Sequence, residues 1–282
     1  MDNNKNYEIE EETTIELLKI PEEDEATIEI SSYDFETHKS YMIAQKALLG
    51  KRKEQQDYKI VYENGNKLLL VVCDGIGGLE KGAEASRLAA ETLKALYVLN
   101  NTPLPMFFRS VADTVNEKVR MLNVSGGSKA TAGTTMVSVI IEDDKLYWWS
   151  IGDSRIYLFR DGEMIQVTQD DNYENKLKRL LKEKEISQEI YNEEIKKGAA
   201  LISFLGKSEI TSINTSKIGF DLRVGDKILM TSDGLYKSMP EERIKDIILS
   251  GCSVMDAATI LENLVKDIAG DNTTFIIAER IK

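Results

Sequence analysis

The stretch LLLVVCDGIGG, residues 68–78, joins five apolar residues and a cysteine to an aspartate and three glycines. An unbroken apolar run of this kind, ended by glycine, is typical of a strand buried on both faces. A carboxylate at the end of such a strand is costly away from water unless it has a partner. The glycines after Asp74 indicate that something approaches the main chain closely where the charge lies.

The sequence around this stretch is rich in predicted strands. Turn signals such as Asn-Gly and Asp-Gly separate apolar or alternating runs, and two of these runs predict hairpins. The runs cover residues 40–48, 58–75, 134–169 and 273–281, of which the second and third are the hairpins. Helical spacing of Ala and Leu predicts helices over 80–99, 104–122 and 252–269. Because the helices come in blocks, we predict an α+β fold with antiparallel sheets covered by helices.

The helix predicted near the C-terminus has a clear start signal. Ser253 is a suitable N-cap, and Asp256 follows three residues later. One apolar face is expected to consist of Val254, Ala257, Ala258, Leu261, Leu264, Val265 and Ile268.

The net charge of −12 is concentrated near the N-terminus. Residues 1–30 contain 11 acidic and 2 lysine residues, so the rest of the chain is close to neutral. We expect residues 1–37 to form an acidic, flexible extension and residues 38–282 to form one domain. The extension is either a solvated leader or a docking or autoinhibitory segment. The acidic balance argues against nucleic-acid binding, because phosphates would be repelled.

The sequence also indicates where the protein works. No apolar run approaches the roughly 18 residues that a membrane helix needs, and the polar N-terminus is no secretory signal. Two cysteines are too few for a disulfide framework. We therefore expect a cytoplasmic protein with no membrane partner.

Several familiar catalytic motifs are incomplete. GIGGLE has Glu80 where a dinucleotide-binding loop needs glycine, and GKS lacks the P-loop glycine at Leu201. Neither Cys73 nor Cys252 precedes an arginine at the spacing of a cysteine phosphatase, and Cys73 fits a small buried residue. The single histidine, His38, cannot build a histidine-rich metal site and is expected to be a structural or surface residue. Any metal must then be bound by oxygen ligands, which favours Mg²⁺ or Mn²⁺.

Aspartates recur at the boundaries of the predicted apolar strands. One Asp-Gly pair alone is typical of a turn, but five such boundaries indicate strand ends that meet around a cation cluster. These aspartates are Asp57, Asp74, Asp153, Asp233 and Asp271.

The ordered motifs resemble those of the PPM family, the metal-dependent protein phosphatases of type 2C in their bacterial style. The motifs are GKRKEQQD, VVCDGIGG, AGTTMVSVII, WSIGDSRIYLFRDG, VTQD, VGDKILMTSDGLY and AGDNTTFII. They cover nearly all of the chain after residue 40. The resemblance implies two packed antiparallel sheets flanked by helices on both faces, an α-β-β-α sandwich. It also places a flap-like helical insertion at about residues 171–200.

The resemblance implies a role for each residue at a matching position. Asp74 would bridge two Mg²⁺ or Mn²⁺ ions, with the Gly75 carbonyl on one of them. Asp233 and Asp271 would bind one metal, and Asp57 would hold water on the other. Two further roles are implied: Asp153 would help to bind a third, weaker metal, and Arg52 would bind the substrate phosphate.

Three positions depart from the family pattern. Gln55 replaces an asparagine in the arginine motif, Ile76 replaces a histidine proposed as general acid, and Asp171 replaces the histidine of T-x-D-H. None of the three is an implied metal ligand, so the departures concern the general acid and local hydrogen bonds.

The implied activity is hydrolysis of phosphoserine and phosphothreonine on proteins by a hydroxide that bridges the two metals. A Ser/Thr kinase would be the opposing enzyme. One alternative is a catalytically silent regulator that binds phosphoproteins; such a relative should have lost metal carboxylates, which this chain retains. The other is a phosphatase for phosphotyrosine or small phosphate esters, because the motifs concern the phosphate and not its carrier.

Overall fold

The structure is a computed structural model that describes residues 35–37, 40–76, 79–124, 132–210 and 213–282. The chain divides into two units, residues 1–33 and 34–282, and the second unit is described below. His38 and nearly all of the predicted acidic extension lie outside the described residues. Their predicted roles, and the predicted domain boundary, stay predictions.

The strands form two sheets in which every pairing is antiparallel. The first sheet has the order β1-β2-β12-β11-β7-β8, with β1 Phe35–Thr37, β2 Tyr41–Leu48, β12 Thr273–Arg280, β11 Lys227–Thr231, β7 Arg155–Arg160 and β8 Glu163–Gln166. The second has the order β10-β6-β5-β4-β3, with β9 also on β6; its bounds are β10 Phe220–Asp221, β6 Lys145–Ile151, β5 Met136–Glu142, β4 Lys67–Asp74, β3 Asp57–Asn64 and β9 Asn214–Thr215.

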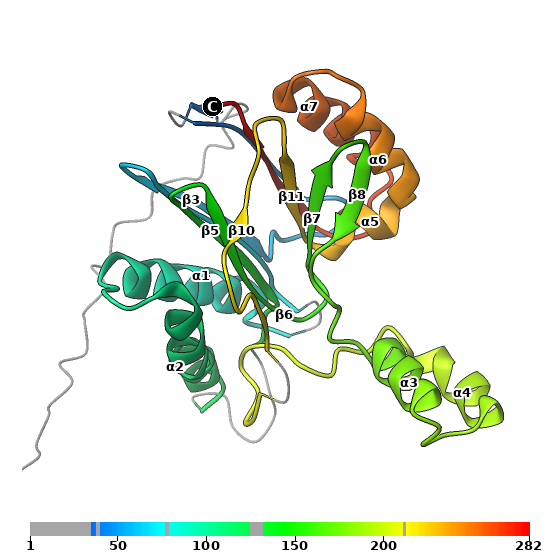
Figure 1. Ribbon diagram of the computed structural model, residues 1–282. Helices are drawn as coiled ribbons and strands as arrows, with labels where there is room; N and C mark the ends of the chain where they lie inside the picture. Colours follow the sequence, from blue (N-terminus) through cyan, green and yellow to red (C-terminus); the bar gives the residue numbers. More distant parts are fainter. Residues whose placement is uncertain (1–34, 38–39, 77–78, 125–131, 211–212) are drawn as a thin grey trace, which may run out of the picture. The chain divides into compact units, whose positions relative to one another are not determined.

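Helices cover the outer face of each sheet, as Figure 1 shows. Helices α1 (Gly82–Val98) and α2 (Leu104–Val124) pack on the second sheet. Helices α5 (Asp233–Ser238), α6 (Glu241–Leu249) and α7 (Val254–Val265) pack on the first. A third apolar cluster fills the space between the sheets. The predicted α+β fold of two sheets flanked by helices is therefore confirmed.

Strand β4 shows why the opening stretch is apolar without a break. Leu69, Val71 and Cys73 pack toward α1 and α2, because alternate side chains of a strand point to opposite faces. Leu68 and Leu70 pack toward the other sheet. All five side chains are fully buried, so both faces of β4 must be apolar. Cys73 is a buried core residue, as predicted, and burial raises the pKa of its thiol.

The run predicted as a hairpin over residues 134–169 forms two hairpins, which belong to different sheets. Strands β5 and β6 pair with each other, and so do β7 and β8, but β6 and β7 belong to different sheets. The chain crosses at Gly152, whose φ of +99° is a conformation that glycine adopts readily. An added Cβ there would lie 2.6 Å from the side chain of Thr135. Sequence periodicity marks strands but carries no signal for the sheet to which a strand belongs.

A helical insertion follows β8, consisting of α3 (Tyr173–Lys182), α4 (Gln188–Glu194) and the short 3₁₀ helix η1 (Ile195–Lys197). Leu177 of α3 is the buried residue among these three helices, whose other described side chains are at least partly exposed. No helix in the described ranges combines the length and the apolar character that a membrane span requires.

Helix α7 begins where it was predicted to begin, but its buried face contains fewer residues than predicted. The Ser253 hydroxyl accepts a hydrogen bond from the Asp256 amide at 3.1 Å, which confirms the N-cap. Val254, Ala257, Ala258, Leu261 and Val265 are buried. Leu264 and Ile268, expected on the same face, are 40% and 55% exposed. The helix ends at Val265, so Ile268 has left the helical spacing, and Leu264 lies on the flank of the buried stripe.

Replacing Ser253 with Ala should destabilise the domain by about 1 kcal/mol, because an amide at the start of α7 loses its acceptor. The expected fall in Tm is roughly 2–4 °C in thermal unfolding followed by circular dichroism. Thr259→Ala is the matched control, since its exposed hydroxyl binds only a carbonyl of its own helix. An equal fall in both variants would contradict the cap.

Candidate active site

The strand ends that carry the predicted carboxylates meet at one end of the two sheets. Asp57 begins β3 and Asp74 ends β4, and the two residues are direct partners across this antiparallel pair. In the other sheet, Asp233 follows β11 and begins α5, and Asp271 lies just before β12. Asp153 lies in the crossing between β6 and β7. The structure thus brings together all five predicted aspartates.

Hydrogen bonds from neighbouring residues hold the ends of β3 and β4 in place. The Ser232 hydroxyl donates to Asp57 Oδ2 at 2.8 Å. The Asp74 carbonyl accepts a hydrogen bond from the Thr134 hydroxyl at 2.9 Å, and the Asp74 amide donates to the Thr135 hydroxyl at 3.1 Å. The main chain around Asp74 is therefore fixed, while no carboxylate oxygen of Asp74 takes part in these bonds.

Gly75 is required by the packing of the main chain. Its amide donates to the Gln56 carbonyl at 3.0 Å. A Cβ at this position would lie 2.4 Å from the Gly82 carbonyl oxygen and 2.5 Å from that of Gln56. The close approach predicted from the glycine is thus, in this structure, an approach of protein backbone at the start of α1. The role of the Gly75 carbonyl as a ligand stays a prediction.

Asp57, Asp74 and Asp153 are largely buried, and the carboxylates of the site repel one another. Burial raises the pKa of Asp57 from 3.8 to about 7, with Asp233 and Asp271 adding to the rise and the Ser232 hydrogen bond opposing it. Burial and the surrounding carboxylates, Asp57 first among them, also raise the pKa of Asp74 well above 3.8. These groups need positive charge nearby in order to be ionised together.

Two basic side chains supply part of that charge. Arg52 Nη2 lies 2.7 Å from Asp271 Oδ2, at a site where both side chains are about two-fifths exposed. Lys237 Nζ contacts Asp233 Oδ2 and lies 3.5 Å from Asp153 Oδ2. Arg52 was expected from the sequence at this site, but Lys237 was not.

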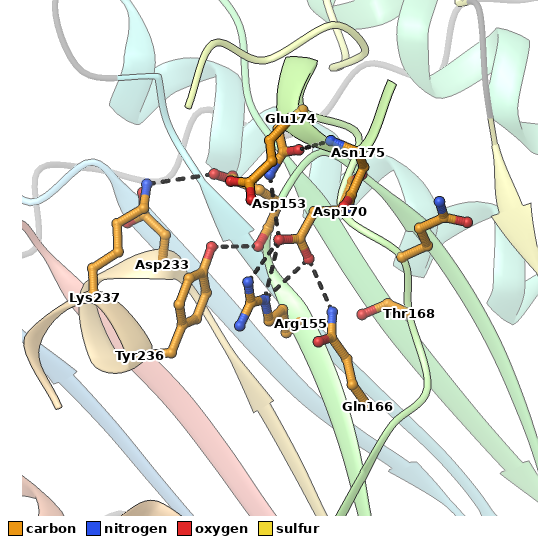
Figure 2. A network of polar contacts seen from close by, with 12 residues as sticks. Asp153, Arg155, Gln166, Thr168, Asp170, Glu174, Asn175, Asp233, Tyr236 and Lys237 are labelled. Carbon is orange, nitrogen blue, oxygen red and sulfur yellow. Dashed lines mark hydrogen bonds and ion pairs between the residues drawn. The ribbon is translucent and has the colours of Figure 1, made fainter. Parts of the chain in front are cut away.

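A polar network fastens the Asp153 loop to α5 and to the segment before α3 (Figure 2). The Tyr236 hydroxyl donates to the Asp153 carbonyl at 2.8 Å. The Arg155 guanidinium lies 3.7 Å from the centre of the Tyr236 ring. Arg155 also forms ion pairs with Asp170 at 2.7 Å and with Glu241 at 2.5 Å. Arg155, Asp170 and Tyr236 were not predicted as parts of the site, although all three lie within the motifs WSIGDSRIYLFRDG, VTQD and VGDKILMTSDGLY.

The three departures from the family pattern have local structural roles. The Gln55 side chain accepts a hydrogen bond from the Asp57 amide at 2.9 Å and so positions the start of β3. The buried Asp171 accepts a hydrogen bond from the Gly152 amide at 3.1 Å, which ties down the crossing beside Asp153. Ile76 Cδ1 packs near Gly133.

The donor set fits a hard divalent cation. Its ligating atoms are carboxylate oxygens, which Mg²⁺ and Mn²⁺ prefer. Asp233 Oδ1 is buried and accepts no hydrogen bond from any described group, so one oxygen is left to be satisfied. As the side chains stand, the described residues contain no group of three acidic, cysteine or histidine side chains close enough to hold a metal. Arg52 and Lys237 lie among the carboxylates in this arrangement.

The fold and the site together define a class: an α+β enzyme domain with an acidic centre suited to divalent cations, built where its two sheets end. The chain belongs to the protein phosphatase 2C family, which it matches over residues 48–268. The predicted family and the predicted kind of enzyme, a protein phosphatase, are therefore confirmed.

Individual relatives are bacterial proteins of similar length and fold. The chain is 28% identical over 236 residues to the serine/threonine phosphatase stp of Listeria welshimeri, covering 81% of this chain and 91% of the relative. The structure of the S. agalactiae serine/threonine phosphatase matches in fold, with a TM-score of 0.71, 22% identity and coverage of 86% and 100%. The catalytic domain of the phosphatase PstP, solved in complex with two manganese ions, matches with a TM-score of 0.68, 26% identity and coverage of 86% and 99%.

Proposed function

We propose that this protein hydrolyses phosphoserine and phosphothreonine residues of other proteins with the help of two Mg²⁺ or Mn²⁺ ions. The observation that carries the proposal is the meeting of five aspartates from both sheets, several with raised pKa values, at one end of the fold. Relatives named as serine/threonine phosphatases, and the manganese-bound PstP domain, support it.

The proposed ligand roles follow the positions of the carboxylates. Asp74 would bind both ions, with the Gly75 carbonyl on one of them. Asp233 and Asp271 would bind one ion, and Asp57, held by Ser232, would bind water on the other. Bound there, the cations would supply Lewis-acid activation of water and neutralise charge on the phosphoryl oxygens. They would also allow carboxylates that otherwise repel one another to be ionised together.

Arg52 would bind the phosphate of the substrate. Arg52 lies in the loop between β2 and β3, its side chain is 43% exposed, and its guanidinium is paired with Asp271. A planar guanidinium has five N–H donors, so it can remain hydrogen-bonded to one carboxylate while it donates two hydrogen bonds to a phosphate. Positioning the phosphate beside the cations would contribute much of the rate, because phosphoryl transfer depends chiefly on alignment and charge.

A cavity beside the helical insertion would accept residues that flank the phosphorylated one. It has a volume of about 620 Å³ and extends from the 169–172 segment to α3. Lys176, Arg179 and Lys207 line it together with Asp170 and Asp171. This mixed charge would suit polar substrate side chains, so we propose that the insertion at residues 171–200 helps to select substrates. An opposing Ser/Thr kinase and a cytoplasmic setting complete the proposal.

Phosphate release from a phosphothreonine peptide tests the proposed activity directly. Release should occur with Mn²⁺ and stop with excess EDTA, because the carboxylates cannot assist without the cations. Asp233→Asn should lower the rate about 100-fold or more at saturating Mn²⁺, since a ligand carboxylate is lost. The matched control is Asp246→Asn, an exposed aspartate of α6, which should keep the wild-type rate.

Other outcomes separate the alternatives. A folded protein that binds Mn²⁺ and releases no phosphate from any peptide would contradict the proposed enzyme activity and favour a phosphoprotein-binding regulator. Faster release from a phosphotyrosine peptide or from p-nitrophenyl phosphate would move the proposal to another substrate class.

A further inference from the structure

Lys237 of α5 lies beside two carboxylates of the site, Asp153 and Asp233. Asp233 is the first residue of α5, and Lys237 follows four residues later, so both lie on one face of the helix. The Lys237 ammonium contacts Asp233 Oδ2 and lies 3.5 Å from Asp153 Oδ2. One lysine thus joins the carboxylate at the start of α5 to a carboxylate of the crossing between the sheets.

The surrounding structure holds Lys237 and Asp153 at this separation. Figure 2 shows Tyr236 and Lys237, adjacent on α5, both directed toward Asp153. The Tyr236 hydroxyl binds the Asp153 carbonyl at 2.8 Å, and Arg155 covers the Tyr236 ring. Because Arg155 is itself paired with Asp170, the helix and the loop are fastened to each other independently of the lysine.

The charges around Lys237 suit a permanent ion pair. The side chains of Asp153 and Asp233 are only 8% and 15% exposed, so leaving both unpaired would be costly. The Lys237 ammonium contacts Asp233 Oδ2 and lies 3.5 Å from Asp153 Oδ2, so its positive charge offsets the negative charge of both carboxylates. Its three N–H donors can serve both carboxylates. Unlike a dissolved cation, it is tethered to the helix and cannot diffuse away.

We propose that Lys237 is a built-in cation at the Asp153–Asp233 pair, which holds Asp233 in position and keeps a further divalent cation away from Asp153. The inference rests on the proposed function, because it concerns the same acidic centre. It replaces the expectation of a third, weaker metal at Asp153 with a protein side chain. Lys237 is a positioning residue in this account, since it acts through Asp233 and touches no substrate.

Mn²⁺ binding to the metal-stripped full chain, followed by isothermal titration calorimetry, tests this inference without measuring activity. The wild type should bind two Mn²⁺ ions per chain. Lys237→Gln should bind an additional Mn²⁺ ion about tenfold more tightly than the wild type binds any third ion, because the competing charge is gone. Adding Asp153→Asn to Lys237→Gln should remove the additional site.

Two control variants make the result specific. Lys237→Arg keeps the charge and should bind Mn²⁺ as the wild type does. Lys245→Gln removes a lysine of α6 that pairs with Glu163 outside the site, and it should also leave binding unchanged. Circular dichroism confirms that each variant is folded.

The outcomes distinguish this inference from the proposed function. Equal Mn²⁺ binding by the wild type and Lys237→Gln, with two ions each, would overturn the role of Lys237 and leave the metal-dependent activity standing. A wild type that already binds three ions would overturn it as well. Folded protein that binds no Mn²⁺ in any variant would overturn both.

Discussion

Replacing Asp74 with Asn should lower kcat/KM for a phosphothreonine peptide about 1000-fold or more and, at the same time, should make the metal-free protein more stable. The loss of activity is expected because a carboxylate between the two proposed cations is removed; about 4 kcal/mol of transition-state stabilisation corresponds to this factor. The gain in stability is expected because burial and four neighbouring carboxylates raise the pKa of Asp74. An ionised Asp74 therefore destabilises the metal-free fold, and Asn carries no such charge.

The pH dependence of this gain has a definite sign. The pKa of Asp74 is higher in the folded protein than its ordinary 3.8, so the contribution of this group to stability is fully present below pH 4 and is lost as the pH rises through the folded-state pKa. Asn cannot ionise, so the variant avoids this loss. In EDTA, the Tm of Asp74→Asn should match that of the wild type near pH 4 and exceed it by roughly 3–8 °C at pH 7.5.

Differential scanning calorimetry in EDTA and in Mn²⁺ measures this effect. Mn²⁺ should stabilise the wild type and should reverse the order of the two proteins, because the metal binds only the ionised carboxylates. Asp246→Asn, exposed on α6, is again the matched control. A variant that is less stable than the wild type in EDTA at pH 7.5 would refute the repulsion, and retained activity would refute the role of Asp74 as a ligand.

Replacing Gly234 with Ala should destabilise the domain by about 2–3 kcal/mol and reduce phosphate release. A Cβ at Gly234 would lie 2.0 Å from the Asn272 carbonyl oxygen and 2.5 Å from Thr273 Oγ1, both at the start of β12. Asp233 precedes this glycine, and Asp271 precedes Asn272. Moving the start of α5 away from the start of β12 to relieve the contact would therefore also separate Asp233 from Asp271, two proposed ligands of one ion. The expected fall in Tm is roughly 4–10 °C.

Gly270→Ala is a sharp control for that substitution. An added Cβ at Gly270 meets no heavy atom within 4 Å, although the residue is next to Asp271. Its Tm should stay within about 2 °C of the wild-type value or rise slightly, because Ala restricts the unfolded chain. Alanine is also favoured over glycine inside a helix, so a large loss at Gly234 would have to come from the close contact. Equal Tm values for the two variants would show that β12 adjusts without cost.

Local sequence patterns predicted most of the long strands, helices α1, α2 and α7, and the five aspartates, but they did not predict α5 or α6. The apolar run of β4 predicted a strand buried on both faces, because successive side chains of a strand point to opposite faces and all of these are apolar. The N-cap at Ser253 was predictable since capping involves only residues a few positions apart. The aspartates could be selected because a charge at the end of an apolar strand is unusual wherever that strand lies.

The tertiary structure decided which of these groups meet and what they pair with. The pairing of β11 with both β12 and β7 places Asp233 beside the residues before those strands, and this pairing joins segments far apart in the chain. No local pattern marked the crossing at Gly152, the ion pair of Arg52 with Asp271, or the approach of Lys237 to Asp153. Charge pairing depends on separations in space that strand periodicity does not encode. The sequence by itself thus indicated most of the long strands, several helices and the five aspartates, whereas only the packing of the two sheets determined the charge environment of each carboxylate.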